Sequence, residues 1–129
     1  MPKKSLPQPT DVELEILNVL WDHGPSTVRE IHHVLAEKRE TGYSTTLKMV
    51  QVMRDKGLLR RDTSVRPQVY RPAMKREETQ VALLDDLAGK AFAGSAQKLV
   101  LSLLSAERLT PDELKELQRI IRRAERDGR

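Results

Sequence analysis

Hydroxyl, amide and basic side chains gather in one short stretch in the first half of the chain. Hydroxyls contact base edges or thymine methyl groups, amides pair with adenine, and lysine donates to the acceptors of guanine. Residues three and four apart share one side of a helix, so a helix here would present several such groups together. The candidate base-reading residues are Ser44, Thr45, Lys48 and Gln51.

Positive charge is concentrated in the same region. Residues 48–71 hold seven Lys or Arg and two Asp, a net charge of +5 against +4 for the whole chain. Arg60, Arg61 and Arg66 are the expected phosphate contacts, which would set affinity and salt dependence. Tyr43 either hydrogen-bonds a phosphate or packs on the preceding helix, whereas we expect Tyr70 to serve in packing. The alternative for the arginines is an ordinary solvated, charged surface.

Other kinds of chemistry find little support. His23, His32 and His33 lack the spacing of a zinc site, because adjacent helical side chains point about 100° apart, so no metal is expected. Asp85 and Asp86 diverge in the same way, and no nucleophile or phosphate-binding glycine loop accompanies them. The chain has no cysteine, which excludes disulfides and thiolate sites. We therefore expect neither an enzyme nor a cofactor.

Local signals predict the elements that would position the basic stretch. Two capping boxes predict the starts of two helices. Thr10 with Glu13 predicts a helix over about 11–22, and Thr27 with Glu30 predicts a second helix after residue 27. Ser44 is the predicted cap of a third helix ending at residues 56–57. An apolar stripe would turn that helix toward the other two, and Trp21 is expected in the core. The stripe is Thr46, Met49, Val50 and Met53.

Two short runs, residues 58–62 and 68–71, predict a β-hairpin after the third helix. Three helices followed by a hairpin is the order of a winged helix-turn-helix, whose third helix enters the DNA major groove. The predicted fold is mainly α with a small hairpin. It comprises a winged-helix DNA-binding domain over 8–73 and a helical dimerisation domain over 74–126.

The C-terminal part predicts three further helices, the last opened by Thr110, Pro111 and Glu113. So small a domain covers its apolar faces poorly, which favours shelter by a symmetry mate in a homodimer. In the alternative, these helices fold back on the N-terminal part. The predicted interface residues are Leu99, Val100, Leu103, Leu104, Leu114, Leu117, Ile120 and Ile121.

Composition limits the remaining classes of protein. The chain has 129 residues, of which 38% are hydrophobic and 33% charged, and this balance suits a folded chain with a densely charged surface. No apolar run approaches the ~18 residues of a spanning helix, and the start lacks a signal-peptide core. We therefore expect a cytoplasmic protein.

Several stretches, taken in order, resemble a known family. They are residues 15–21, 27–31, 42–58, 68–70 and 98–104. Together they resemble the penicillinase repressor family, also called BlaI/MecI/CopY, over roughly residues 8–122. The resemblance implies a bacterial dimeric repressor with an N-terminal winged helix and a C-terminal helical dimerisation domain, bound to operators with dyad symmetry.

The sequence departs from that family pattern in two places. In β-lactam-responsive members, a membrane sensor-protease system triggers cleavage of an Asn-Phe bond; here the matching pair is Ser102 and Leu103, still within an apolar helix. Copper-responsive members use C-terminal cysteines, which this chain lacks. We thus expect a dimeric repressor that reads an inverted-repeat DNA operator through the third helix and the wing and is released by a signal or by proteolysis. The alternative is a winged-helix adaptor that binds protein.

Overall fold

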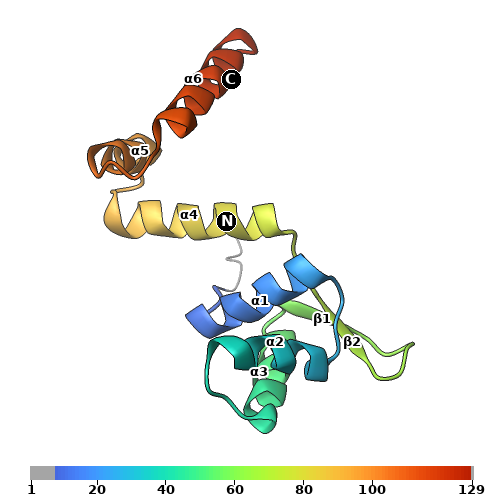
Figure 1. Ribbon diagram of the computed structural model, residues 1–129. Coiled ribbons are helices and arrows are strands. Elements are labelled where there is room, and N and C mark those ends of the chain that lie inside the picture. Colours follow the sequence, from blue (N-terminus) through green and yellow to red (C-terminus); the bar gives the residue numbers. More distant parts are fainter. Residues whose placement is uncertain (1–7, 129) are drawn as a thin grey trace, which may run out of the picture. The chain divides into compact units, whose positions relative to one another are not determined.

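The computed structural model describes residues 8–128, which form six helices and one β-hairpin (Figure 1). The chain divides into two compact units, one up to Leu83 and the other from Leu84 onward, so the division falls inside the fourth helix. The elements are α1 (Asp11–His23), α2 (Val28–Lys38), α3 (Tyr43–Asp55), β1 (Leu59–Asp62), β2 (Val69–Pro72), α4 (Arg76–Ala91), α5 (Ala96–Ser105) and α6 (Pro111–Arg126).

Capping boxes begin α1 and α2 as the sequence predicts. The Thr10 hydroxyl accepts a hydrogen bond from the Glu13 amide, and the Glu13 carboxylate accepts one from the Thr10 amide. Thr27 and Glu30 repeat the arrangement at α2. Each box satisfies two backbone donors that the first turn of a helix leaves free, which fixes where the helix starts.

The predicted start of α3 is wrong by two residues. Gly42, in extended backbone conformation, is the N-cap, and no side chain caps the helix. Ser44 therefore lies inside the first turn rather than before it, and its side chain is exposed. Because the Ser44 hydroxyl is not used in capping, it remains available on the outer surface of α3.

The core of the first unit lies where α1, α2, α3 and the hairpin meet. The predicted stripe of α3 faces this core: Thr46, Val50 and Met53 are fully buried and Met49 is partly buried. The other buried members come from α1, α2 and the hairpin with the residue before it, and they include Ile16, Leu17, Leu20, Ile31, Leu35, Leu58, Leu59 and Tyr70.

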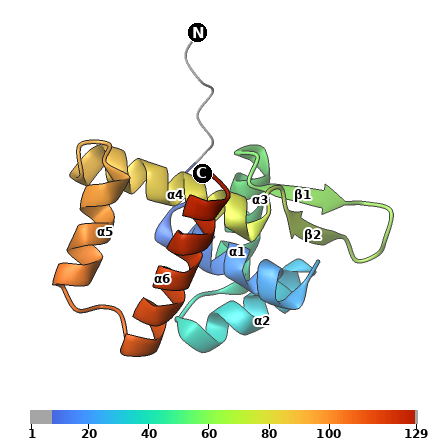
Figure 2. The same ribbon diagram turned by 90° about the horizontal axis from the view of Figure 1, so that it is seen from above.

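The hairpin extends from the helices as a wing (Figures 1 and 2). β1 and β2 pair antiparallel, with Leu59 opposite Pro72 and Asp62 opposite Val69, so each strand starts one residue later than predicted. Tyr70 is buried, as expected. Its backbone also exchanges two hydrogen bonds with Ser26, at 2.8 and 3.1 Å, which ties the wing to the turn between α1 and α2.

Trp21 links the end of α1 to the start of α4. Its indole Nε1 donates to the Met74 carbonyl at 3.2 Å, and the Arg76 guanidinium lies 5.5 Å from the ring centroid. Arg76 also pairs with Asp22. Trp21 is thus a half-buried residue at the edge of the core rather than at its centre, and it holds the start of α4 against the end of α1.

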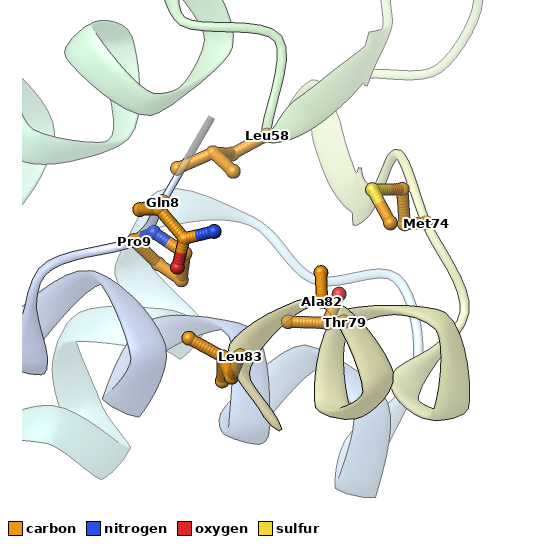
Figure 3. Close-up of a pocket in the computed structure, with 7 residues that line it drawn as sticks. All are labelled: Gln8, Pro9, Leu58, Met74, Thr79, Ala82 and Leu83. Atoms are coloured by element: carbon orange, nitrogen blue, oxygen red, sulfur yellow. The ribbon is translucent and has the colours of Figure 1, made fainter. Parts of the chain in front are cut away.

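A small pocket marks the place where the start of α1, the start of the hairpin and the first half of α4 meet (Figure 3). Its volume of about 10 Å³ is close to the minimum for one water molecule, so it is a packing gap rather than a ligand site. The residues that line it are Gln8, Pro9, Leu58, Met74, Thr79, Ala82 and Leu83.

The second unit contains the rest of α4 with α5 and α6. Ala88 and Leu99 are buried in this unit. A third capping box, formed by Thr110 and Glu113, begins α6, and this helix has no buried residue. Within residues 8–128, no helix is long and apolar enough to cross a membrane.

Candidate nucleic-acid interface

The outer face of α3 presents polar and basic groups. Ser44, Lys48 and Gln51 are exposed on one side of the helix, while Thr46 and Val50 on the opposite side are fully buried. This division follows from the helical period, because residues three and four apart share a face. Thr45 and Val52 are also exposed and flank this polar face.

Tyr43, the first residue of α3, packs on α2. Its ring and that of His32 meet in a T-shaped pair, with centroids 5.7 Å apart and planes at 84°. The Arg29 guanidinium lies 5.5 Å from the centroid of the Tyr43 ring. His32 is held in turn by a 2.9 Å hydrogen bond between its Nδ1 and the Thr46 hydroxyl. Of the two roles expected for Tyr43, the structure contains the packing on the preceding helix. With 41% of its surface exposed, the residue can still contact a ligand.

A groove of about 470 Å³ lies between the start of α2, the outer side of α3 and the wing. It brings together four of the predicted DNA contacts, namely Tyr43, Gln51, Arg61 and Arg66. It also contains polar and basic residues that were not predicted as DNA contacts, chiefly Arg29, Gln68 and Thr27. Its remaining lining is Val28, Leu47, Pro67 and Tyr70.

The three arginines of this groove have no acidic partner, unlike some other basic residues of the first unit. Across the described part of the chain, no carboxylate lies within 4 Å of a guanidinium nitrogen of Arg29, Arg61 or Arg66. By contrast, Lys56 pairs with Glu13 at 2.8 Å and Arg54 with Asp55 at 3.3 Å. The basic residues of 48–71 are therefore not equivalent. Lys56 and Arg54 are paired with acids, whereas Arg61 and Arg66 in the groove have no acidic partner among the described residues; the same holds for Lys48, Arg60 and Arg71 outside it.

The other four predicted DNA contacts, Ser44, Thr45, Lys48 and Arg60, lie outside this groove. Thr45 and Lys48 line a separate, mostly apolar hollow of about 290 Å³ on another side of α3, together with Glu13, Met49 and Val52. Arg60 is exposed on β1 next to Arg61, and neighbouring residues of a strand point to opposite faces. Only one of the two can therefore face the groove, and that one is Arg61.

Asp62 fixes the beginning of the loop at the tip of the wing. Its Oδ1 accepts hydrogen bonds from the Ser64 hydroxyl at 2.6 Å and the Ser64 amide at 2.9 Å. These bonds favour the ionised carboxylate and lower the pKa of Asp62. The carboxylate is thereby turned into its own loop and forms no ion pair with Arg61 or Arg66.

The predicted interface residues of the second unit fall into two groups. Leu99 is buried within its own unit, whereas the other seven are exposed, with between 37% and 56% of their surface accessible: Val100, Leu103, Leu104, Leu114, Leu117, Ile120 and Ile121. Ser102 and Leu103, the pair at the family's cleavage position, lie inside α5 and are both exposed.

Comparison with known proteins agrees with this architecture. The family model described as "Penicillinase repressor" matches residues 9–123. The transcriptional regulator BlaI of Mycobacterium tuberculosis is 30% identical over 86% of this chain and 80% of its own length. The penicillinase repressor of Bacillus licheniformis is 25% identical over 92% of both chains.

A solved structure resembles the N-terminal part. It is the solution structure of monomeric Bacillus licheniformis BlaI in complex with the blaP half-operator, with a TM-score of 0.52 and 28% identity over 59% of this chain and 93% of that one. This likeness confirms the winged-helix fold expected from the order of elements. Because the matching family model describes repressors, the expectation of a protein that is not an enzyme is confirmed as well. The chain belongs to the penicillinase repressor family.

Proposed function

We propose that this protein is a DNA-binding transcriptional repressor that reads its operator with α3 and the wing. The observation that supports this most is the position of the groove arginines without acidic partners beside the polar outer face of α3. A face of that kind fits the edges of base pairs, and neighbouring cations fit the phosphates that flank them. The operator complex of the related BlaI supports the same choice of ligand.

The side chains divide into two roles. We assign base reading to Ser44, Thr45, Lys48 and Gln51, because all four are exposed on α3. Tyr43, Arg60, Arg61 and Arg66 are assigned to phosphates, where they would set affinity on every sequence alike. Arg60, on the opposite face of β1 from Arg61, would reach a different part of the backbone.

The second unit is proposed to form the homodimer. Seven exposed apolar side chains on α5 and α6 make a surface that a second copy would cover. Two copies related by a two-fold axis would present two α3 helices, so the operator would be an inverted repeat with half-sites one or two DNA turns apart.

Release is proposed to act on the same surface. Cleavage between Ser102 and Leu103 would cut α5 in its last turn and divide the apolar face that holds the dimer. A membrane sensor-protease system is the partner that family membership suggests for this step. The sequence at the bond differs from Asn-Phe, so its protease would need a different side-chain preference.

Selection from a pool of random duplexes tests the proposal without knowledge of the operator. The purified chain should enrich one sequence arranged as an inverted repeat, and the Gln51→Ala variant should enrich it less strongly. Recovery of unrelated sequences by both proteins would contradict a specific operator and favour the adaptor hypothesis.

A further inference from the structure

We infer that Arg29, at the start of α2, closes a phosphate clamp together with Arg61 and Arg66 of the wing, and that one DNA phosphodiester is held between them. The inference rests on the proposed DNA-binding function and adds a residue and a binding site to it. The sequence offered no reason to choose Arg29, since it lies in another helix, fourteen positions before the nearest predicted contact.

The first support is convergence of charge. Arg29 comes from α2, whereas Arg61 and Arg66 come from the wing, and all of α3 lies between these segments in the sequence. The fold nevertheless brings the three arginines to one groove of about 470 Å³. None of the three has a carboxylate within ion-pairing distance in the part of the chain that the structure describes. Positive charges that share a groove without acids repel one another. An anion that enters the groove would reduce this electrostatic repulsion and would also accept hydrogen bonds from the arginines.

The second support is that Arg29 is oriented before any ligand binds. Its guanidinium lies 5.5 Å from the centroid of the Tyr43 ring, and Tyr43 is itself held by the edge contact with His32. An arginine placed on an aromatic face loses less freedom when it binds than a free one, and it keeps its N–H groups in the plane available for a phosphate. The Thr46 hydroxyl, bonded to His32, connects this stack to the buried side of α3.

The groove also lies at the positive end of a helix dipole. α2 begins at Val28 after the Thr27 cap, and Thr27, Val28 and Arg29 all line the groove. The first turn of a helix directs free N–H groups and partial positive charge toward its N-terminus. This contribution strengthens a site that the three arginines already define.

A phosphodiester fits this groove better than a base edge. Three arginines line the groove and no carboxylate does, which suits an anion. Gln68 and Tyr43 supply neutral donors around the arginines, and Gln51, assigned to base reading, lines the α3 side of the groove. Arginine binds phosphate with two parallel hydrogen bonds, which lysine cannot do. Since a phosphate carries no sequence information, the clamp would raise affinity for all duplexes and fix the register of α3 on its operator.

Binding of Arg29→Ala to labelled DNA from the upstream region of the protein's own gene tests the clamp, with a scrambled duplex alongside. We expect affinity for both duplexes to fall roughly tenfold, and the slope of log K against log salt to become shallower by about 0.9, the value of one phosphate contact. Arg29→Lys should recover part of the affinity. Arg39→Ala is the matched control, because Arg39 lies at the other end of α2 and pairs with Glu15.

A neutral backbone linkage identifies the phosphate. Duplexes carrying one methylphosphonate at successive positions should include a position that weakens the wild type but leaves Arg29→Ala unaffected. Equal losses for both proteins at every position would overturn the clamp. If the wild type prefers the native duplex and Arg29→Ala matches it on both duplexes, the clamp alone fails. If the wild type binds neither duplex, or binds both equally, the proposed function fails with it. Thermal unfolding of the variants checks that all are folded.

Discussion

The Glu13 carboxylate of α1 accepts two hydrogen bonds from Lys56 Nζ, at 2.8 and 3.0 Å, and so joins the first helix to the end of α3 across 43 positions of sequence. Glu13 is buried, with 6% of its surface exposed, and it also caps α1. Burial alone would raise the pKa of Glu13, but the bonds from Lys56 and Thr10 outweigh it and the pKa is lowered. One carboxylate therefore fixes both the start of α1 and the position of α3.

This pair predicts how stability depends on pH. A carboxylate with a lowered pKa in the folded state stabilises above its unfolded pKa, and that contribution is lost as pH falls through the folded value. The free energy of unfolding should thus decrease below about pH 4.5, and Glu13→Gln should flatten that decrease. Urea titrations between pH 3 and 7 measure it. An unchanged slope in the variant would contradict the assignment.

Removing the lysine should cost more than removing the acid. Lys56→Met leaves a buried carboxylate without its cation, whereas Glu13→Gln leaves a neutral amide that still accepts a hydrogen bond. We expect Glu13→Gln to cost about 1 kcal/mol of unfolding free energy and Lys56→Met about 2–3 kcal/mol at pH 7. If chemical denaturation gave equal losses of unfolding free energy for the two variants, the result would argue against a buried charge on Glu13.

The contact of Trp21 with Met74 predicts that the start of α4 depends on α1. Trp21→Phe removes the 3.2 Å hydrogen bond to the Met74 carbonyl and weakens the stacking of Arg76. The expected loss is about 1–2 kcal/mol, with faster amide hydrogen exchange in the first turn of α4. Exchange that increases equally throughout the unit would instead indicate general loosening of the core.

Local patterns were sufficient to predict the elements, and contacts distant in sequence were not. The capping boxes and the stripe of Thr46, Val50 and Met53 depend on residues three or four positions apart. Such short spacings can be read directly from the sequence. The bridge from Ser26 to Tyr70 joins residues 44 positions apart, and nothing local marks Ser26 as a strand partner. The predicted start of α3 is wrong because serine is a favoured N-cap residue. In the structure the N-cap position is taken by Gly42, whose backbone is extended.

The site was predicted only in part for the same reason. The exposed residues of α3 follow from the helical period. Whether a basic side chain forms an ion pair does not follow from that period. Lys56 and Arg66 both carry a positive charge, and only the fold gives Lys56 the partner Glu13. Arg29 enters the groove because α2 begins beside the wing, and no local pattern in the sequence marks that contact.

Base reading by α3 predicts losses that are confined to the operator. Lys48→Ala or Gln51→Ala should weaken operator binding by about 1–3 kcal/mol, or roughly 5- to 150-fold, and leave binding to scrambled DNA nearly unchanged. Asp55→Asn on the last residue of α3 serves as a surface control. A parallel loss on both duplexes would move these side chains from base reading to phosphate contact.

The exposed apolar face predicts a dimer that one charge can break. Leu103→Asp would place a carboxylate in the proposed interface, and sedimentation should show monomers with much weaker operator binding. Leu101→Asp is the matched control, since Leu101 lies on the same helix and is also exposed but was not assigned to the interface. A Leu103→Asp chain that stays dimeric would place the interface elsewhere.

Binding to duplex DNA across a salt series tests the central claim most directly. Purified protein should bind DNA from its own upstream region more tightly than a scrambled duplex, lose affinity steeply as salt rises, and saturate at two chains per site. The Arg61→Ala/Arg66→Ala variant should bind both duplexes more weakly, with a shallower slope. Weak binding that is equal on both duplexes, insensitive to salt and unaffected by these substitutions would contradict the assignment of α3 and the wing to DNA.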